Sequence, residues 1–327
     1  MTRNTIGIAF IGAGTVAEMH GRGIAACSNA RLVGTYDLDR QKAETITTKF
    51  GGRVFDTPQQ LLAEPGVDAV HVLTPVHQHV SNAVESLKAG KHVLLEKPVA
   101  ETLEDIALLK AAAEQANRVC MPAHNYIYVP SIRRAKRLLQ EGRLGDIGSL
   151  WILYNIFHSE QTAATYGGVL RAVCNHHAYS VLYLLGRPRR VMAMTSRVHY
   201  KKLTCEDQAM IVCEMENGSM ANLWCSFATD DPTSDPWTVL YKILGTNGGI
   251  SYSWNEAQFR DEGGPAWGMP CYEEGFVEEI EYFSNRCVLG GEQPLSTLVD
   301  AADALKILMA AERCISKPET LEKVDFE

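Results

Sequence analysis

The chain has 327 residues, which is too long for one typical core and suits two domains. Hydrophobic residues make up 46% of the chain and charged residues 21%, a globular composition, and the formal net charge of −8 disfavours nucleic acid as a partner. The nine cysteines include no Cys-x-x-Cys pair and no apolar run is long enough to span a membrane, so we expect no disulfide framework, no metal site, no membrane partner and a reducing, cytoplasmic setting.

The first 125 residues alternate short apolar runs with segments of helical periodicity. The apolar runs are rich in Val, Ile and Leu, as buried strands of a parallel sheet are. They cover residues 6–11, 31–36, 69–73, 92–95 and 118–121, with helical patterns such as 80–89 and 103–116 between them. This alternation predicts a doubly wound parallel sheet, a Rossmann domain, over residues 1–125.

The pattern changes after Asn125, where we place the domain boundary. Helices are predicted for residues 130–141, 177–185, 277–287 and 298–314. Longer apolar runs follow one another at 147–157, 190–199, 208–214, 220–227 and 237–244, and Asn217-Gly218 is a strong hairpin signal. We therefore expect an α+β domain with an open, largely antiparallel sheet over residues 126–327.

Residues 12–17 read Gly-Ala-Gly-Thr-Val-Ala, a G-x-G-x-x-A sequence between the first strand and a helix. Gly12 permits a tight turn, Gly14 lets the backbone approach a pyrophosphate, and Ala17 allows close packing of helix on strand. The free N–H groups of the helix N-terminus favour the phosphates. The cofactor-binding residues predicted here are Gly12, Ala13, Gly14, Thr15 and Val16.

Asp37 ends the second strand, about 20 residues after the glycine loop, where a ribose-binding acid is expected. Its carboxylate can accept hydrogen bonds from a ribose 2′-hydroxyl and would repel a 2′-phosphate, which favours NAD over NADP. Arg40 nearby keeps NADP open as an alternative, and a plain turn-capping role is the alternative for Asp37.

Two further segments carry a resemblance. Residues 74–79 read Thr-Pro-Val-His-Gln-His, and residues 90–98 read Gly-Lys-His-Val-Leu-Leu-Glu-Lys-Pro. With the glycine loop, His124-Asn125-Tyr126 and the turn at 245–249, they resemble the Gfo/Idh/MocA family, named for glucose–fructose oxidoreductase and inositol dehydrogenase. The resemblance covers most of the chain, and Glu-Lys-Pro is its most specific mark.

The resemblance implies a Rossmann domain followed by an open sheet flanked by helices. It also implies reversible hydride transfer between nicotinamide, bound between the domains, and a hydroxyl-bearing carbon of a sugar, sugar derivative or cyclitol. A dimer or tetramer formed through the open sheet face is a further implication. The additional cofactor-binding residues expected are Thr74, Pro75, His79, Glu96, Lys97 and Asn125; for His79, packing or helix capping is the alternative.

Lys97 stands at the carboxyl end of a strand, which faces the ligand crevice in such a sheet. A lysine there can hold an alcohol oxygen and ease its deprotonation. The alternative is an exposed surface lysine. We predict Lys97 to be catalytic.

The second family landmark is incomplete. Gly167-Gly168 match the glycine turn and His176 matches the expected histidine, but Ala172 stands where dehydrogenating members carry Asp, and Tyr179 stands at the position of a second acid. His176 can still act as general acid or base, because imidazole titrates near neutral pH. We predict His176 to be catalytic. The candidate substrate-contacting residues are Tyr128, His158, Tyr166 and His177, with a place in the rim or core as the alternative.

The predicted function is that of an NAD-dependent oxidoreductase. Two alternatives remain open because Ala172 removes a carboxylate. One is NAD-assisted glycoside elimination or hydrolysis with no net redox change. The other is a catalytically inactive, NAD-linked sugar-binding or regulatory protein.

Overall fold

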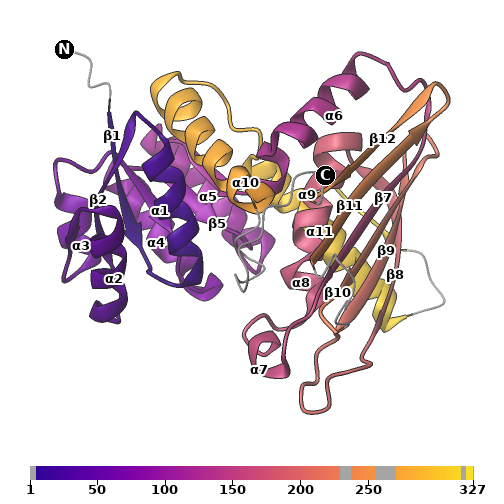
Figure 1. The fold of residues 1–327 in the computed structure, drawn as a ribbon, viewed down its shortest axis with the longest axis horizontal. Helices are drawn as coiled ribbons and strands as arrows, with labels where there is room; N and C mark the ends of the chain where they lie inside the picture. The colour runs from indigo at the N-terminus through magenta and orange to yellow at the C-terminus, as the bar shows by residue number, and fades with distance from the viewer. Residues whose placement is uncertain (1–4, 229–236, 255–269, 318–321, 327) are drawn as a thin grey trace. The chain divides into compact units, whose positions relative to one another are not determined.

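The computed structural model describes residues 5–228, 237–254, 270–317 and 322–326. The chain divides into two compact units (Figure 1). Unit 1 comprises Met1–Val129 and Glu273–Ala302, and unit 2 comprises Pro130–Tyr272 and Asp303–Glu327. Compared with the predicted division at residue 125, unit 1 runs four residues further and takes in a segment near the C-terminus.

Unit 1 contains a six-stranded parallel sheet in the order β3-β2-β1-β4-β5-β6, which confirms the doubly wound Rossmann fold. The strand order reverses between β1 and β4, and ligands of such sheets bind outside the carboxyl ends of the strands at this point. The strands are β1 (Ile6–Ile11), β2 (Ala30–Tyr36), β3 (Arg53–Val54), β4 (Ala69–Val72), β5 (His92–Glu96) and β6 (Cys120–Ala123).

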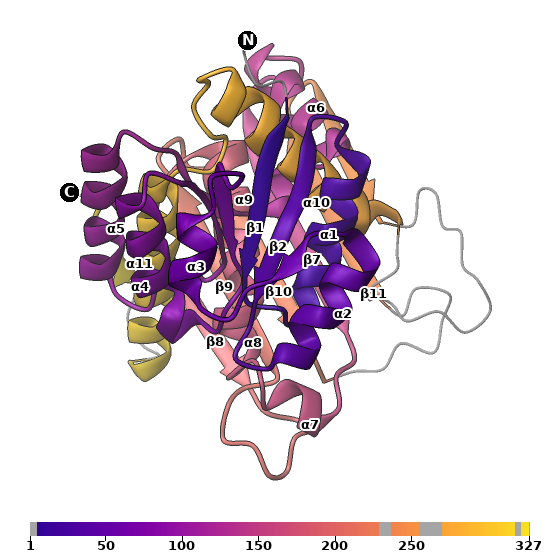
Figure 2. The same ribbon diagram turned by 90° about the vertical axis from the view of Figure 1, so that its left-hand side faces the viewer.

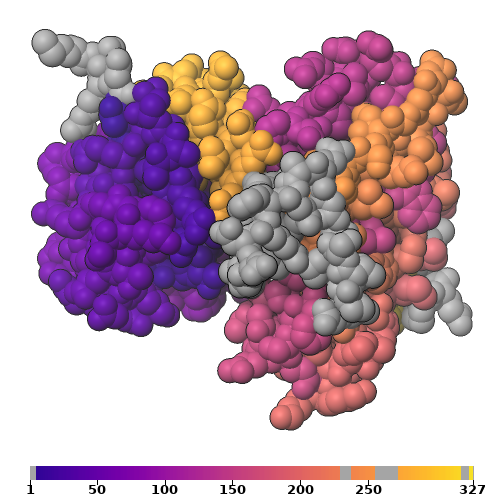
Figure 3. Space-filling model, in the orientation of Figure 1, coloured from indigo at the N-terminus to yellow at the C-terminus, as the bar shows by residue number. Residues whose placement is uncertain are grey.

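Helices cover both faces of this sheet, with α1 and α2 on one side and α4 and α5 on the other (Figure 2). In the space-filling view the indigo-to-violet residues of unit 1 form one continuous mass (Figure 3), and every residue of β1 is buried. Asp39, Thr57 and Thr102 cap α2, α3 and α5 by accepting a hydrogen bond from a backbone N–H of the first turn. The helices are α1 (Thr15–Ala26), α2 (Arg40–Phe50), α3 (Pro58–Ala63), α4 (His79–Lys88) and α5 (Leu103–Ala116), with 3₁₀ turns η1 (Val76–Gln78) and η2 (Asn125–Tyr128).

A helical segment close to the C-terminus completes unit 1. It consists of α10 (Pro270–Glu281) and a π-helical stretch, η4 (Tyr282–Leu289). The Phe276 ring lies 5.3 Å from the His20 ring. A Cβ built on Gly23 would lie 2.4 Å from Cδ1 of Ile280, so glycine is what allows α1 and α10 to approach this closely.

Unit 2 contains a seven-stranded sheet in the order β12-β11-β7-β10-β9-β8-β13. All neighbours are antiparallel except β7 and β10, so the prediction of a largely antiparallel sheet is confirmed, with one parallel pair. Asn217-Gly218 forms the predicted β9–β10 turn, with Gly218 at φ 83°. The strands are β7 (Ile147–Ile156), β8 (Pro188–Ser196), β9 (Gln208–Met215), β10 (Met220–Ser226), β11 (Trp237–Gly245), β12 (Gly248–Ser253) and β13 (Glu322–Lys323).

Helices α9 and α11 pack on one face of this sheet (Figure 1). Ser180 of α9 hydrogen-bonds the Tyr241 hydroxyl of β11 at 3.0 Å, and Cys314 of α11 contacts the backbone of Ala193 in β8. The helices of unit 2 are α6 (Pro130–Gln140), α7 (Glu160–Ala163), α8 (Val169–Ala172), α9 (Cys174–Leu185) and the part of α11 (Leu298–Ser316) that follows Ala302.

The opposite face of the sheet, here called the outer face, carries apolar side chains and is covered by no helix of the described residues. Strand pairing places Met194, Met210, Trp224, Leu153 and Leu240 in one row across β8, β9, β10, β7 and β11. Met194 is 68% exposed, and Trp151 in the next row is 48% exposed. Such a patch is unusual for a protein that stays monomeric.

Candidate active site

The glycine loop of unit 1 has the geometry that a dinucleotide requires. Gly12 adopts φ 102°, and a Cβ on it would lie 2.7 Å from the backbone carbonyl of Leu73, so no other residue fits without strain. Gly14 begins α1 without a side-chain cap, and nothing lies within 4 Å of where its Cβ would be. The N-terminus of α1 therefore has no side-chain cap and has open space beside Gly14, which fits a pyrophosphate.

Asp37 is held beside this loop by two backbone amides. Its Oδ2 accepts a hydrogen bond from Ala13 N–H at 2.6 Å, and its Oδ1 accepts one from Asp39 N–H at 2.8 Å. Each carboxylate oxygen keeps a second lone pair. The side chain is thus fixed in orientation and still able to accept hydrogen bonds from ribose hydroxyls.

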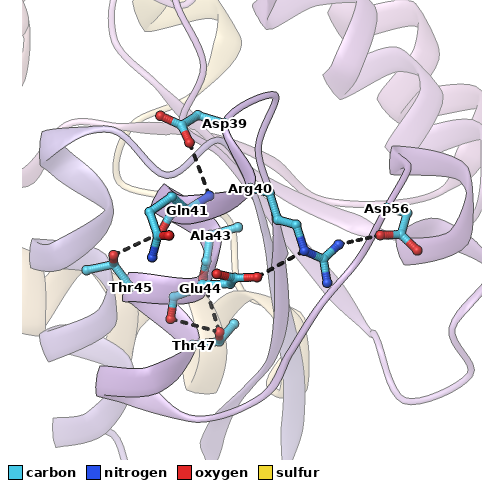
Figure 4. A network of polar contacts seen from close by, with 8 residues as sticks. All are labelled: Asp39, Arg40, Gln41, Ala43, Glu44, Thr45, Thr47 and Asp56. Carbon is cyan, nitrogen blue, oxygen red and sulfur yellow. Dashed lines mark hydrogen bonds and ion pairs between the residues drawn. The ribbon is translucent and has the colours of Figure 1, made fainter.

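Arg40, the residue considered for binding a 2′-phosphate, forms ion pairs with two carboxylates of unit 1. Its guanidinium donates to Glu44 at 2.9 Å and to Asp56 at 2.5 Å (Figure 4). The hydrogen bonds that Arg40 donates to Asp56 and Glu44 raise the pKa of Arg40 above its ordinary value. Asp39 meanwhile accepts the Gln41 N–H as the cap of α2.

His79 joins two loops at the carboxyl edge of the sheet. Its Nδ1 lies 2.8 Å from the Pro98 carbonyl oxygen and its Nε2 lies 2.6 Å from that of Thr74. Burial lowers the pKa of His79, and its contacts with the two carbonyls act in the opposite direction. With both ring nitrogens engaged by the protein, this geometry favours a positioning role over direct contact with the cofactor. His79 thus connects Thr74 to Pro98, which forms a cis peptide bond with Lys97. Pro75, which follows Thr74, is exposed.

Glu96 is the last residue of β5, and Lys97 follows it. Glu96 is 7% exposed; its Oε2 accepts the Lys97 N–H at 3.0 Å, and its Oε1 lies 3.0 Å from Nε2 of His20. Burial acts to raise the pKa of Glu96, but the His20 hydrogen bond and nearby positive charge outweigh it and the pKa is lowered. Both oxygens of Glu96 are therefore used within unit 1.

The ammonium of Lys97 makes no hydrogen bond or ion pair with any residue that the structure describes. Burial lowers the pKa of Lys97, and the adjacent Glu96 charge opposes that shift. A lysine in this state can hold a substrate oxygen and exchange a proton with it more readily than a surface lysine.

Several buried groups behind Glu96 were not singled out from the sequence. His20 contacts His71 through their Nδ1 atoms at 3.1 Å. Glu279 of α10 is fully buried, and burial together with the Glu96 charge raises its pKa well above the usual value. The available signal was His71, a histidine within an otherwise apolar strand.

Two more predicted residues of unit 1 are buried. Tyr128 is 0% exposed, donates its hydroxyl to Sδ of Met121 at 3.3 Å and packs on Tyr282. Asn125 is 4% exposed, and its carbonyl lies 3.0 Å from a Cβ built on Gly275. The complete burial of Tyr128 and its contacts with Met121 and Tyr282 favour a packing role for this residue.

In unit 2, the rings of His158 and Tyr166, two residues predicted to contact the substrate, lie against each other. Their rings stack at 5.4 Å with an interplanar angle of 26°, and Phe227 packs edge-on against His158 at 4.8 Å. Burial lowers the pKa of His158, and Tyr166 remains 37% exposed. The three rings form an aromatic cluster just past the ends of β7 and β10.

The Gly167–Gly168 turn follows this cluster, with φ of 68° and 110°. It leads through α8, which ends at Ala172, into α9, where His176 is 7% exposed. His177 differs: it is 0% exposed, its Nδ1 lies 3.1 Å from Sγ of Cys225, and burial lowers its pKa to about 3. This environment favours a core role for His177.

No group of three His, Cys, Asp or Glu side chains in the described part of the chain is arranged to hold a metal ion. Among the described helices, none has the length and apolar character needed to cross a membrane.

Comparisons with known proteins agree with this geometry. The family described as "Oxidoreductase family, NAD-binding Rossmann fold" matches residues 6–124, and the GFO/IDH/MocA C-terminal domain matches residues 132–251. The scyllo-inositol 2-dehydrogenase (NAD(+)) of Bacillus subtilis strain 168 is 24% identical, over 93% of this chain and 92% of that protein. The glucose-6-phosphate 3-dehydrogenase of the same strain is 34% identical over a matched segment of 143 residues. This segment makes up 44% of this chain and only 40% of that protein.

Among solved structures, GenD2 from gentamicin A biosynthesis in complex with NAD is 25% identical, with a TM-score of 0.85 over 98% of this chain and 97% of that one. The two family models together span both units. The chain therefore belongs to the Gfo/Idh/MocA family of oxidoreductases, and its N-terminal part is an NAD-binding Rossmann domain.

Proposed function

We propose that this protein is an NAD-dependent dehydrogenase that oxidises a hydroxyl-bearing carbon of a sugar, sugar derivative or cyclitol, and reduces the ketone in the reverse direction. The observation that carries the proposal is Lys97: a half-buried lysine at the carboxyl end of β5, with a pKa lowered by burial, whose ammonium has no partner among the described residues. The relatives include dehydrogenases of scyllo-inositol and of glucose 6-phosphate, which supports this class of substrate.

Bound NAD would take the hydride from the substrate carbon. Lys97 holds the alcohol oxygen by a charge-assisted hydrogen bond and stabilises the negative charge that develops on it. His176 accepts the hydroxyl proton as general base, and returns it in the reverse reaction. Gly12 to Val16 bind the pyrophosphate, Asp37 binds the ribose, and His79 and Glu96 fix the loops that present Lys97.

The test is a screen of sugars and cyclitols with NAD, monitored by the absorbance of reduced nicotinamide. Steady accumulation of NADH with turnover supports a dehydrogenase. Product formed without net NADH would instead indicate elimination or hydrolysis, and a sugar that raises NAD affinity without being converted would indicate a binding protein.

We also propose that the protein is a homo-oligomer whose outer faces pair with a second copy. The support is the row of apolar side chains across five strands, with Met194 and Trp151 substantially exposed. Pairing two such faces would remove this apolar area from water. The cytoplasmic location stays a prediction from the cysteine pattern.

A further inference from the structure

Ala172 stands in unit 2 where the family resemblance implies an acid. Ala172 is the last residue of α8, a single helical turn that follows the Gly167–Gly168 turn and precedes the helix of His176. A carboxylate brought to this turn from elsewhere in the chain would restore the charge.

Glu206 brings one, from the loop between β8 and β9. Its Oε1 accepts a hydrogen bond from the Leu170 N–H of α8 at 2.9 Å. A Cβ built on Gly168 would lie 2.4 Å from Oε1 and 2.8 Å from Oε2 of Glu206. The whole carboxylate thus lies against the Gly168 α-carbon, and glycine is needed there both for φ 110° and for this space.

The loop that carries Glu206 is anchored beside the aromatic cluster. The next residue, Asp207, is fully buried and its carboxylate accepts N–H groups of Val198, His199 and Tyr200 at 2.8–3.1 Å. The Asp207 carbonyl accepts the Phe227 N–H, and the Phe227 carbonyl accepts the His158 N–H, both at 2.9 Å. Glu206 is therefore fixed close to the backbone of two members of that cluster.

No Lys, Arg or His among the described residues forms an ion pair with Glu206. Arg171, the basic residue of α8, forms a double hydrogen bond with Glu312, one at 2.6 Å. Arg197 and Lys201, in the loop of Glu206, donate to backbone carbonyls instead. Oε2 of Glu206 has no hydrogen-bond or ion-pair partner among the residues that the structure describes.

We propose that Glu206 supplies the carboxylate missing at Ala172 and determines substrate class. Its free oxygen accepts hydrogen bonds from hydroxyl groups of an uncharged sugar or cyclitol. It disfavours a substrate that places a carboxylate or phosphate at this position, because two negative charges would lie close together. The inference rests on the proposed dehydrogenase function and assigns the substrate class of that same site.

The test compares Glu206→Gln with the matched control Glu216→Gln, an exposed glutamate at the other end of β9. The amide oxygen of glutamine can still accept the Leu170 N–H, so the turn should hold and only the charge is lost. We expect kcat/KM for a neutral sugar found in the screen to fall about 10- to 100-fold, the range for hydrogen bonds to a charged group. The preference for that sugar over the matching uronic acid should shrink at least about tenfold, and Glu216→Gln should behave as wild type.

Unchanged kcat/KM and unchanged discrimination in Glu206→Gln would overturn the inference. A second measurement needs no variant: the wild-type NADH complex should bind the neutral sugar at least about tenfold more tightly than the uronic acid, and equal or tighter binding of the acid would also overturn it. If wild type reduces no NAD with any polyol, the proposed function fails; a sugar that raises NAD affinity without being converted then serves as the neutral ligand, and comparing its binding with that of the matching uronic acid in wild type and in Glu206→Gln still tests the role of Glu206.

Discussion

Cofactor choice is the property that the geometry of unit 1 determines most directly. The Asp37 carboxylate is fixed by the amides of Ala13 and Asp39, so it cannot swing away from a 2′-phosphate. A phosphate carries nearly two negative charges, and one pair of charges about 5 Å apart is worth about 3 kcal/mol at an effective dielectric of about 20. Because Asp37 is only half-buried, solvent screens part of this repulsion.

We therefore expect NAD to bind at least about tenfold more tightly than NADP, which is about 1.4 kcal/mol. Asp37→Ala should narrow this gap, because it weakens NAD binding and also relieves the repulsion of NADP. Asp56→Asn should narrow the gap between NAD and NADP affinity by improving NADP binding alone. It removes one of the two carboxylates that bind Arg40, so the guanidinium becomes available to a 2′-phosphate while NAD binding is unchanged. Glu104→Gln, an exposed acid in the first turn of α5, serves as the control.

Binding of both cofactors to wild type and to these variants is measured by titration calorimetry. Equal affinity of wild type for NAD and NADP would refute the reasoning. So would an Asp56→Asn variant with unchanged NADP affinity, since it would mean that Arg40 is not restrained by its ion pairs.

Three further predictions concern catalysis, the core and assembly. Lys97→Met should keep NAD binding and lower turnover about 100-fold or more, and His176→Ala should lower it about 10²- to 10⁴-fold, as measured on any substrate from the screen; near-normal rates in both would contradict the site assignment. Burial lowers the pKa of His177 in the folded protein to about 3, whereas an unfolded histidine titrates at about 6.5. Acidification from pH 7 to pH 5 therefore protonates His177 only in the unfolded chain, which lowers the free energy of unfolding by about 2 kcal/mol. Denaturant unfolding should show that this part of the pH dependence is absent in His177→Gln. Met194→Glu should reduce the mass measured by light scattering, whereas Leu108→Glu on exposed α5 should not.

Much of unit 1 could be predicted because its signals are local. Short runs of Val, Ile and Leu gave β1, β2, β4, β5 and β6, and the glycine loop was found by spacing alone. The two-residue strands β3 and β13 were missed, since two residues carry no periodicity. The parallel pairing of β7 with β10 could not be predicted either, because it depends on which strands meet and not on either strand's own pattern.

The segment 273–302 illustrates a second limit. Its helical character was predicted from periodicity. Such a pattern indicates which face of a helix is buried, but it does not indicate which other element of the fold that face packs against. Ile280 packs against Gly23 and Phe276 against His20, contacts that span more than 250 residues of chain. The small residue at position 23 is the feature that admits the helix, and in the sequence it is one glycine among 26.

The candidate site divides along the same line. Lys97 and His176 could be proposed as catalytic residues because each lies in a recognisable local motif. The groups that set their environment lie far away in sequence: Glu96 meets His20 across 76 residues, and Glu206 meets Leu170 across 36. The absence of an acid at Ala172 is visible in the sequence, but its replacement can be found only where a loop folds back on a glycine. The loss of one local carboxylate therefore does not by itself argue for loss of catalysis, because the fold places another carboxylate against the same turn.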